Sequence, residues 1–291
     1  MLQRTFWTAI AIVILAQVGM AQNQRSFDVE VSGKGSPIIF IPGLASAGST
    51  WDDTVKHYKD RFECHVLTLG GFAGKPPIDS PLLDTVAKHL VAYVQEKKLD
   101  HPVIVGHSLG GYLALKLASE HPDLFGRIVI VDALPFFAGA SNPTITLEAA
   151  RQMAEGMRKQ MLSTIGSASS FNPEQMAATM ANKPADVARI AEWTRNSDVK
   201  TVAGAMYELF STDLRQQIAA IRVPALVLGT WIAYKEYATR DQVESNFRRQ
   251  YATLPGYKLV LFDQARHFLM WDDPDMFYRE VDDFLSGKTI R

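Results

Sequence analysis

Short apolar runs alternate with helix-patterned segments from Phe27 to the end of the chain. The apolar runs are continuous and mostly β-branched, and they cover residues 37–41, 64–69, 102–105, 128–131, 225–228 and 259–262. Apolar residues at helical spacing mark residues 51–62, 82–94, 108–119, 242–251 and 274–285. Buried strands that alternate with amphipathic helices predict an α/β protein with a mostly parallel sheet and helices on both faces.

This alternation stops in the stretch from Pro135 to Arg222. The stretch has helical patterns and six methionines but no clear strand, and methionine at helical spacing is typical of a packed core. We therefore expect a helical cap over residues 135–222, inserted between the two parts of the α/β core, residues 22–134 and 223–291.

The first 21 residues have a different pattern. A single positive charge precedes an almost wholly apolar run at residues 6–18, and the small residues Gly19 and Ala21 fit cleavage after Ala21. An uncleaved anchor is the alternative, although the run is shorter than the ~20 residues that span a bilayer. The pattern predicts a signal peptide over residues 1–21 and a secreted or periplasmic protein without stable membrane insertion.

Composition and charge narrow the possible partners. Hydrophobic residues make up 47% and charged residues 21% of the chain, as in ordinary globular proteins. The formal net charge of −1 gives no bias toward nucleic acid, so the expected partner is a small-molecule substrate. The seven histidines are scattered and the one cysteine, Cys64, cannot form an internal disulfide. We expect no metal and no cofactor, and the oligomeric state is left open.

One motif carries chemistry. Residues 103–111, VIVGHSLGG, combine an apolar strand, a G-x-S-x-G sequence and the start of a helix. A serine in this context lies on a sharp turn, so Gly106 and Gly110 must be small. The turn lifts the Ser108 hydroxyl above the sheet at a helix N-terminus, which favours developing negative charge. A plain helix-capping serine is the alternative, but the strand and helix that flank the motif favour a nucleophile.

Three segments of the chain resemble the α/β-hydrolase superfamily. Residues 106–111 resemble its nucleophile elbow, residues 40–44 (FIPGL) its oxyanion-hole strand end, and residues 266–274 its catalytic-histidine loop. The order of serine before histidine also fits. The resemblance covers nearly all of residues 27–285 and implies an α/β-hydrolase fold.

The resemblance also implies roles for individual residues. Ser108 would be the nucleophile and His267 its general base, while the backbone N–H groups of Leu44 and Leu109 would form the oxyanion hole. Many relatives have His-Gly where this chain has Pro42-Gly43. That difference keeps the backbone donor but removes a side chain that often braces the loop.

The family's catalytic triad also includes an acid that orients the histidine. The position of this acid is where the chain departs from the family pattern. Most relatives carry it after the first strand past the cap, but no carboxylate closely follows residues 225–228. Asp132 instead stands at the end of strand 128–131, a position that some members such as haloalkane dehalogenases use. We favour Asp132, because the sheet fixes its position, although an Asp at a strand end is also frequent as a structural residue. Glu236, Asp241 and an incomplete triad remain alternatives.

The other histidines are predicted to be structural, and His107, next to the nucleophile, to be a packing residue. The structural set comprises His57, His65, His89, His101 and His121. The glycine-rich segment at residues 70–74 does not lead into a helix as a dinucleotide-binding loop does, so it predicts a turn.

These residues favour hydrolysis of a carboxylic ester, or of a lactone or thioester, through an acyl-enzyme. Phe136, Phe137 and Trp193 in the cap indicate a small to medium apolar acyl group. A peptidase or C–C bond hydrolase on the same triad is an alternative, as is a non-catalytic binding protein on a hydrolase scaffold. Dehalogenases and epoxide hydrolases of this superfamily use Asp where Ser108 stands, which disfavours those activities.

Overall fold

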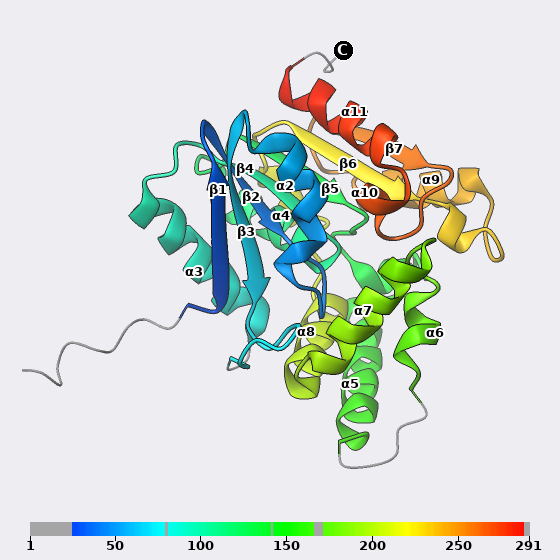
Figure 1. Cartoon of the computed structure of the whole chain (residues 1–291). Helices are drawn as coiled ribbons and strands as arrows, with labels where there is room; N and C mark the ends of the chain where they lie inside the picture. The colour runs from blue at the N-terminus through cyan, green and yellow to red at the C-terminus, as the bar shows by residue number, and fades with distance from the viewer. Residues whose placement is uncertain (1–24, 79–80, 141, 166–170, 288–291) are drawn as a thin grey trace, which may run out of the picture.

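The computed structural model describes residues 25–78, 81–140, 142–165 and 171–287. Within these ranges, seven strands form one sheet in the order β1-β3-β2-β4-β5-β6-β7 (Figure 1). β1 is antiparallel to β3, and all other neighbours are parallel. The strands are β1 (Phe27–Gly33), β2 (Ser36–Ile41), β3 (Phe62–Leu69), β4 (Val103–His107), β5 (Arg127–Val131), β6 (Ala225–Thr230) and β7 (Lys258–Phe262). The predicted signal peptide, residues 1–21, lies outside the described residues.

Helices bury both faces of this sheet. Successive strand residues point to opposite faces, so Ile39 and Phe40 of β2 belong to two different apolar clusters. The covering helices are α2 (Asp52–Tyr58), α3 (Leu82–Lys97), α4 (Leu109–Glu120), α9 (Arg240–Gln250) and α11 (Pro274–Leu285). α3, α4 and α9 contribute to the Ile39 cluster, and α2 and α11 to the Phe40 cluster. The predicted α/β architecture with a mostly parallel sheet is thereby confirmed.

The helix expected over residues 51–62 is wrong beyond Tyr58. α2 ends at Tyr58, and Phe62 already pairs with Ser36 as the first residue of β3. The rings of Tyr58 and Phe62 meet edge to face with their centroids 5.8 Å apart. A helix end and a strand start thus send two apolar side chains, four residues apart, into the same core. Their spacing imitates one turn of helix.

The chain between β5 and β6 forms helices and no strand in the residues that the structure describes. The main ones are α5 (Leu147–Ser163), α6 (Pro173–Ala177), α7 (Pro184–Asn196) and α8 (Val199–Ser211). In Figure 1 they gather at the end toward which the β3 arrow points, the carboxyl edge of the parallel strands. The Asp198 backbone N–H at the start of α8 donates to the Gly71 carbonyl, 2.7 Å away, just after β3. The helices therefore adjoin the edge where the candidate site lies, and the boundaries 135 and 222 stay a prediction.

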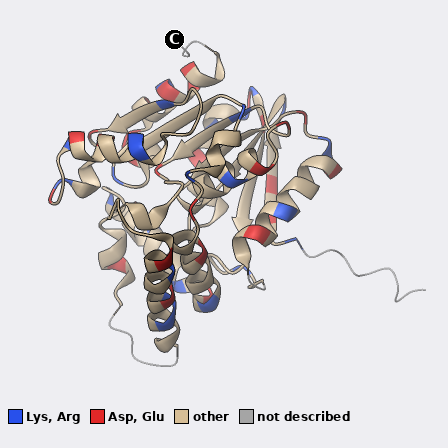
Figure 2. Cartoon of the chain, turned by 180° about the vertical axis from the view of Figure 1, so that it is seen from behind, with Lys and Arg blue, Asp and Glu red and all other residues tan. Residues whose placement is uncertain are grey.

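Charges of both signs are distributed over the molecule. Figure 2 shows Lys, Arg, Asp and Glu interspersed along the helices rather than gathered by sign. This distribution agrees with the formal net charge of −1. Within the described part of the chain, no helix has the length and apolar character needed to cross a membrane.

Candidate active site

Ser108 joins the end of β4 to the start of α4. Its backbone has φ 52° and ψ −116°, a conformation that residues other than glycine rarely adopt. Its N–H donates to the Val131 carbonyl at 2.9 Å, which fixes the turn to the neighbouring strand β5. The side chain is largely buried, with 9% of the residue exposed. The strand–turn–helix context that the sequence predicts for Ser108 is present.

The glycines around Ser108 allow this turn to pack. A Cβ atom on Gly106 would lie 2.1 Å from the Gly110 carbonyl oxygen. A Cβ atom on Gly110 would in turn lie 2.2 Å from the Ile41 carbonyl oxygen. Both contacts are with backbone atoms that cannot move aside, so the motif needs glycine at these two positions.

His267 and Asp132 form a hydrogen-bonded pair. His267 lies between β7 and α10 (Leu269–Asp272), and its Nδ1 is 2.6 Å from Asp132 Oδ2. Asp132 directly follows β5 and is 8% exposed. Its second carboxylate oxygen accepts the Thr230 backbone N–H at 3.3 Å, and its own N–H donates to the Leu228 carbonyl at 2.7 Å. The sheet thus holds the carboxylate in place, with one oxygen directed at the imidazole.

His107 supports the loop of the predicted base. Its Nε2 is 3.0 Å from the His267 carbonyl oxygen, which can only accept, so Nε2 carries the proton. Its Nδ1 is buried without a partner among the described residues. Burial, together with the neighbouring His267, holds the pKa of His107 well below its usual value, so its imidazole is neutral. The sequence predicts only packing for His107, because nothing local reveals the contact with a residue 160 positions away.

The predicted oxyanion-hole residues lie beside the elbow. Leu109 is the first residue of α4, and Leu44 follows β2. A Cβ atom on Gly43 would lie 3.3 Å from Ser108 Cβ, so the Leu44 turn directly adjoins the predicted nucleophile. The backbone N–H groups of Leu44 and Leu109 have no acceptor among the hydrogen bonds of the described residues. Leu44 and Leu109 stay the predicted oxyanion-hole donors.

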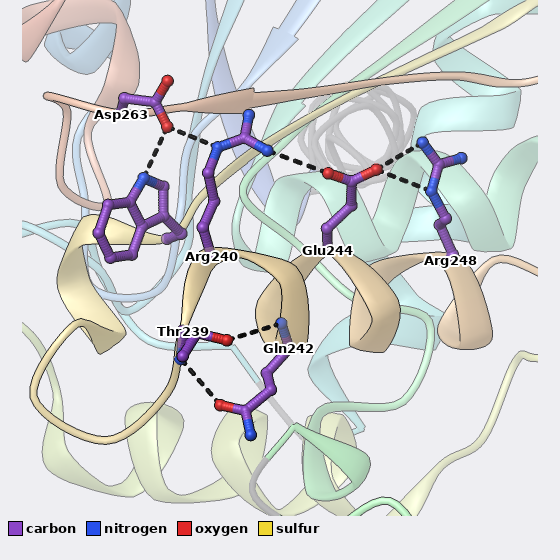
Figure 3. A network of polar contacts seen from close by, with 7 residues as sticks. Thr239, Arg240, Gln242, Glu244, Arg248 and Asp263 are labelled. Carbon is purple, nitrogen blue, oxygen red and sulfur yellow. Dashed lines mark hydrogen bonds and ion pairs between the residues drawn. The ribbon is translucent and has the colours of Figure 1, made fainter.

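The alternative acids lie on the surface. Glu236 has a side chain that is 76% exposed, and Asp241 is exposed in the first turn of α9. In the described part of the chain, neither contacts His267. The charged groups around them pair with one another instead: Asp263 accepts from Arg240 Nε at 2.8 Å, and Glu244 binds Arg240 on one side and Arg248 on the other (Figure 3).

Four of the remaining histidines, His57, His65, His89 and His101, form side-chain hydrogen bonds away from Ser108. His57 binds Asp282, and His65 lies between Tyr93 and Glu63.

The Cys64 thiol is buried, which raises its pKa to about 11 and makes it a poor nucleophile at neutral pH. Residues 70–74 form a turn, as predicted. No group of three or more possible metal ligands occurs within the described ranges.

A family model described as the alpha/beta hydrolase family matches residues 38–280. The chain belongs to the alpha/beta hydrolase family. The match runs from β2 to α11, so it includes the Ser108 elbow, Asp132 and His267. The family resemblance inferred from the three short segments is thereby confirmed.

Curated members of this family align with almost the whole chain. An N-formylmaleamate deformylase of Pseudomonas putida is 24% identical over 93% of this chain and 96% of its own length. A pimeloyl-(acyl-carrier protein) methyl ester esterase of Vibrio atlanticus is 24% identical over 87% of this chain and 96% of its own length. These named hydrolases agree with the prediction that this alpha/beta hydrolase is an enzyme.

Solved alpha/beta hydrolase structures agree with the fold. An esterase from Thermogutta terrifontis superposes with a TM-score of 0.70 at 20% identity, over 90% of this chain and 93% of that one. An enol-lactonase from Burkholderia xenovorans superposes with a TM-score of 0.67 at 19% identity, over 89% of this chain and 96% of that one. At these identities the likeness establishes the fold alone.

Proposed function

We propose that this hydrolase cleaves a carboxylic ester, including a lactone or thioester, through an acyl-enzyme on Ser108. The observation that carries the proposal is a strained Ser108 at a helix N-terminus whose neighbour, His107, packs against His267 with ring centroids 4.5 Å apart, while His267 is hydrogen-bonded to the buried Asp132. Holding a side chain such as Ser108 at positive φ costs on the order of 1–3 kcal/mol, and such strain clusters at functional sites. A non-catalytic binding protein on the same scaffold is the alternative that labelling of Ser108 would exclude.

Each residue has a defined task in the proposed reaction. His267 takes the proton of the Ser108 hydroxyl as its oxygen attacks the substrate carbonyl, and later gives that proton to the leaving alcohol. Asp132 keeps the Nδ1 proton of His267 in place, so that Nε2 is the basic nitrogen, and stabilises the imidazolium that forms. The N–H groups of Leu44 and Leu109 bind the oxyanion, each worth about 3 kcal/mol. Water then releases the acid by the same steps.

The cap residues support an apolar acyl group of small to medium size. Met180, Trp193 and Phe268 belong to the same apolar cluster, and Phe268 follows the predicted base directly. Phe136, by contrast, is fully buried beneath the Arg215 guanidinium, 4.6 Å from its ring centroid. Phe136 therefore serves the packing of the cap, and the side of the cap near Phe268 is the better candidate for the acyl group.

A fluorophosphonate probe tests the nucleophile directly. The wild-type chain should be labelled at Ser108, and Ser108→Ala should lose both labelling and turnover of p-nitrophenyl esters while it stays folded. Ser119→Ala is a matched control, since Ser119 is also a buried serine, lies in α4 and donates to the Lys116 carbonyl within its own helix. A Ser108→Ala variant with near wild-type turnover would overturn the assignment. A series of esters with increasing acyl length then defines the preferred substrate.

A further inference from the structure

The loop that carries His267 is tied to the cap by one carboxylate. Asp272, the last residue of α10, is half-buried and accepts two backbone N–H groups. Its Oδ2 accepts from Arg266, the residue before His267, and its Oδ1 accepts from Asn182 in the turn between α6 and α7, both at 2.9 Å. Asp272 therefore holds the loop of the predicted base and the cap at the same time.

Further contacts join the same two segments. The Asn182 side chain donates to the Gln264 carbonyl and accepts from Arg266 Nε, each at 3.0 Å. The Phe268 backbone N–H donates to the Met180 carbonyl at 3.2 Å. The residues on either side of the predicted base are thus both bonded to the turn at residues 178–183, which belongs to the cap rather than to the sheet.

The two backbone hydrogen bonds of the Asp272 carboxylate hold the loop of His267 and the cap turn in fixed positions. Burial raises the pKa of this carboxyl group, while the two backbone donors lower it and favour the charged form. A carboxylate that is removed from water depends on its few partners, because losing one leaves a costly unpaired charge. Exposed ion pairs, such as that of Glu174 with Arg195 in the cap, are under no such constraint.

We propose that Asp272 is a positioning residue for His267, and that the cap turn at residues 178–183 completes the support of the catalytic base. This inference rests on the proposed role of His267. Both carboxylate oxygens of Asp272 are bonded to backbone N–H groups. It acts by holding the backbone on one side of His267, so that the imidazole meets Asp132 and Ser108 together. A displacement of the cap turn would loosen the base as well as open the site.

The cap offers a carboxylate of the same kind away from His267. Glu208 on α8 accepts the backbone N–H groups of Leu82 and Leu83, at 2.8 and 2.9 Å, and so ties the cap to the start of α3. It is also partly buried, which raises its pKa. Glu208→Gln therefore removes a comparable link between cap and core without touching the loop of His267.

The test compares Asp272→Asn with Glu208→Gln. We measure kcat and KM for a p-nitrophenyl ester from pH 5 to 9, together with the urea midpoint of unfolding. Both variants should lose stability. Only Asp272→Asn should also lower kcat, by about 10- to 100-fold with little change in KM, as a displacement near 1 Å does. The loss should appear across this whole pH range, because the imidazole is displaced from both Asp132 and Ser108.

Asn182→Ala removes the Asn182 side-chain contacts while leaving every charge in place. It should lower kcat with little change in KM, by a smaller factor than Asp272→Asn does. It replaces Asp272→Asn in the test if that variant does not fold. Equal kcat losses in Asp272→Asn and Glu208→Gln, or an unchanged kcat in Asn182→Ala, would overturn the inference. Failure of the wild-type chain to react with the fluorophosphonate would instead overturn the proposed function itself.

Discussion

Two neighbouring strands each end in a residue with a strained backbone. Ser108 follows β4 with φ 52°, and Asp132 follows β5 with φ 45°. Neighbouring strands hold both residues in these conformations, because the N–H of Ser108 donates to β5 and the N–H of Asp132 donates to β6. The strands thus direct a hydroxyl and a carboxylate out of the same edge, and His267 meets the carboxylate there.

Asp132→Asn should leave the fold intact and lower kcat by about 10⁴-fold, because an amide favours the wrong imidazole tautomer. Glu236→Gln and Asp241→Asn are the matched controls and should retain nearly full activity, since both side chains are exposed. Steady-state kinetics on an activated ester would decide the matter. Loss of activity in either control, with Asp132→Asn still active, would place the acid after β6.

The buried neutral His107 predicts a pH dependence of stability. Its pKa is lowered in the folded state, while in the unfolded chain it returns to about 6.5. As pH falls below that value, the unfolded state gains a proton that the folded state does not bind, so His107 costs stability in acid, by up to about 1.4 kcal/mol per pH unit. Urea midpoints of wild type and His107→Gln should therefore converge from pH 8 to pH 5. Parallel curves would contradict the buried neutral state.

The sequence predicts those residues whose chemistry depends on local pattern. Glycine spacing is enough to predict Ser108 as the nucleophile, and a place after the last strand is enough to predict His267 as its base. Asp132 could be favoured because a strand end has a fixed position. The roles of His107 and Asp272 were not predictable, since each depends on backbone groups brought close only by folding: the His267 carbonyl in one case, the Asn182 N–H in the other.

At the scale of elements, the cap contacts the core at several points. The turn between α6 and α7 bonds to the loop of His267, and the junction of α7 and α8 bonds to the loops after β2 and β3. At that junction, Ser197 Oγ accepts the Ala73 backbone N–H at 2.9 Å. α7 therefore connects the segment near the predicted oxyanion hole with the segment of the predicted base.

The space around two glycines, Gly110 in α4 and Gly156 in α5, predicts opposite effects on stability when each is replaced by alanine. Gly110→Ala should destabilise the protein by about 3 kcal/mol and reduce fluorophosphonate labelling, because the new methyl group would collide with the Ile41 carbonyl. Gly156→Ala in α5 meets nothing within 4 Å and should stabilise by about 1 kcal/mol. Urea denaturation measures both. A tolerated Gly110→Ala would show that the elbow can shift.

Element boundaries were predicted well where turn residues mark them and poorly elsewhere. α11 was expected and found at Pro274–Leu285, with Asp273 capping its first turn. No Gly or Pro separates α2 from β3, and the helix expected over residues 51–62 ran too far. β1 was not predicted as a strand, because it is an edge strand whose residues are mostly exposed after Phe27. Its only partner in the sheet is β3.

At the scale of the whole molecule, the sequence pattern predicts export. Expressed from its own start in a Gram-negative bacterium, the protein should lose 21 residues and reach the periplasm with Gln22 at its N-terminus. Fractionation and intact mass measure both outcomes. Ile12→Lys interrupts the apolar run and should keep the chain in the cytoplasm, uncleaved. A soluble cytoplasmic wild-type product that retains Met1 would refute export.

The antiparallel direction of β1 has a practical consequence for attaching the enzyme to a support. Phe27 pairs with Leu69, so the first strand begins at the carboxyl edge of the parallel strands, where the cap and Ser108 lie. The other end of the described chain, Gly287, lies beside Arg127 at the start of β5, on the opposite edge. A bead or sensor surface joined through the N-terminus would crowd the substrate's approach, whereas one joined through the C-terminus would leave that side facing the solution.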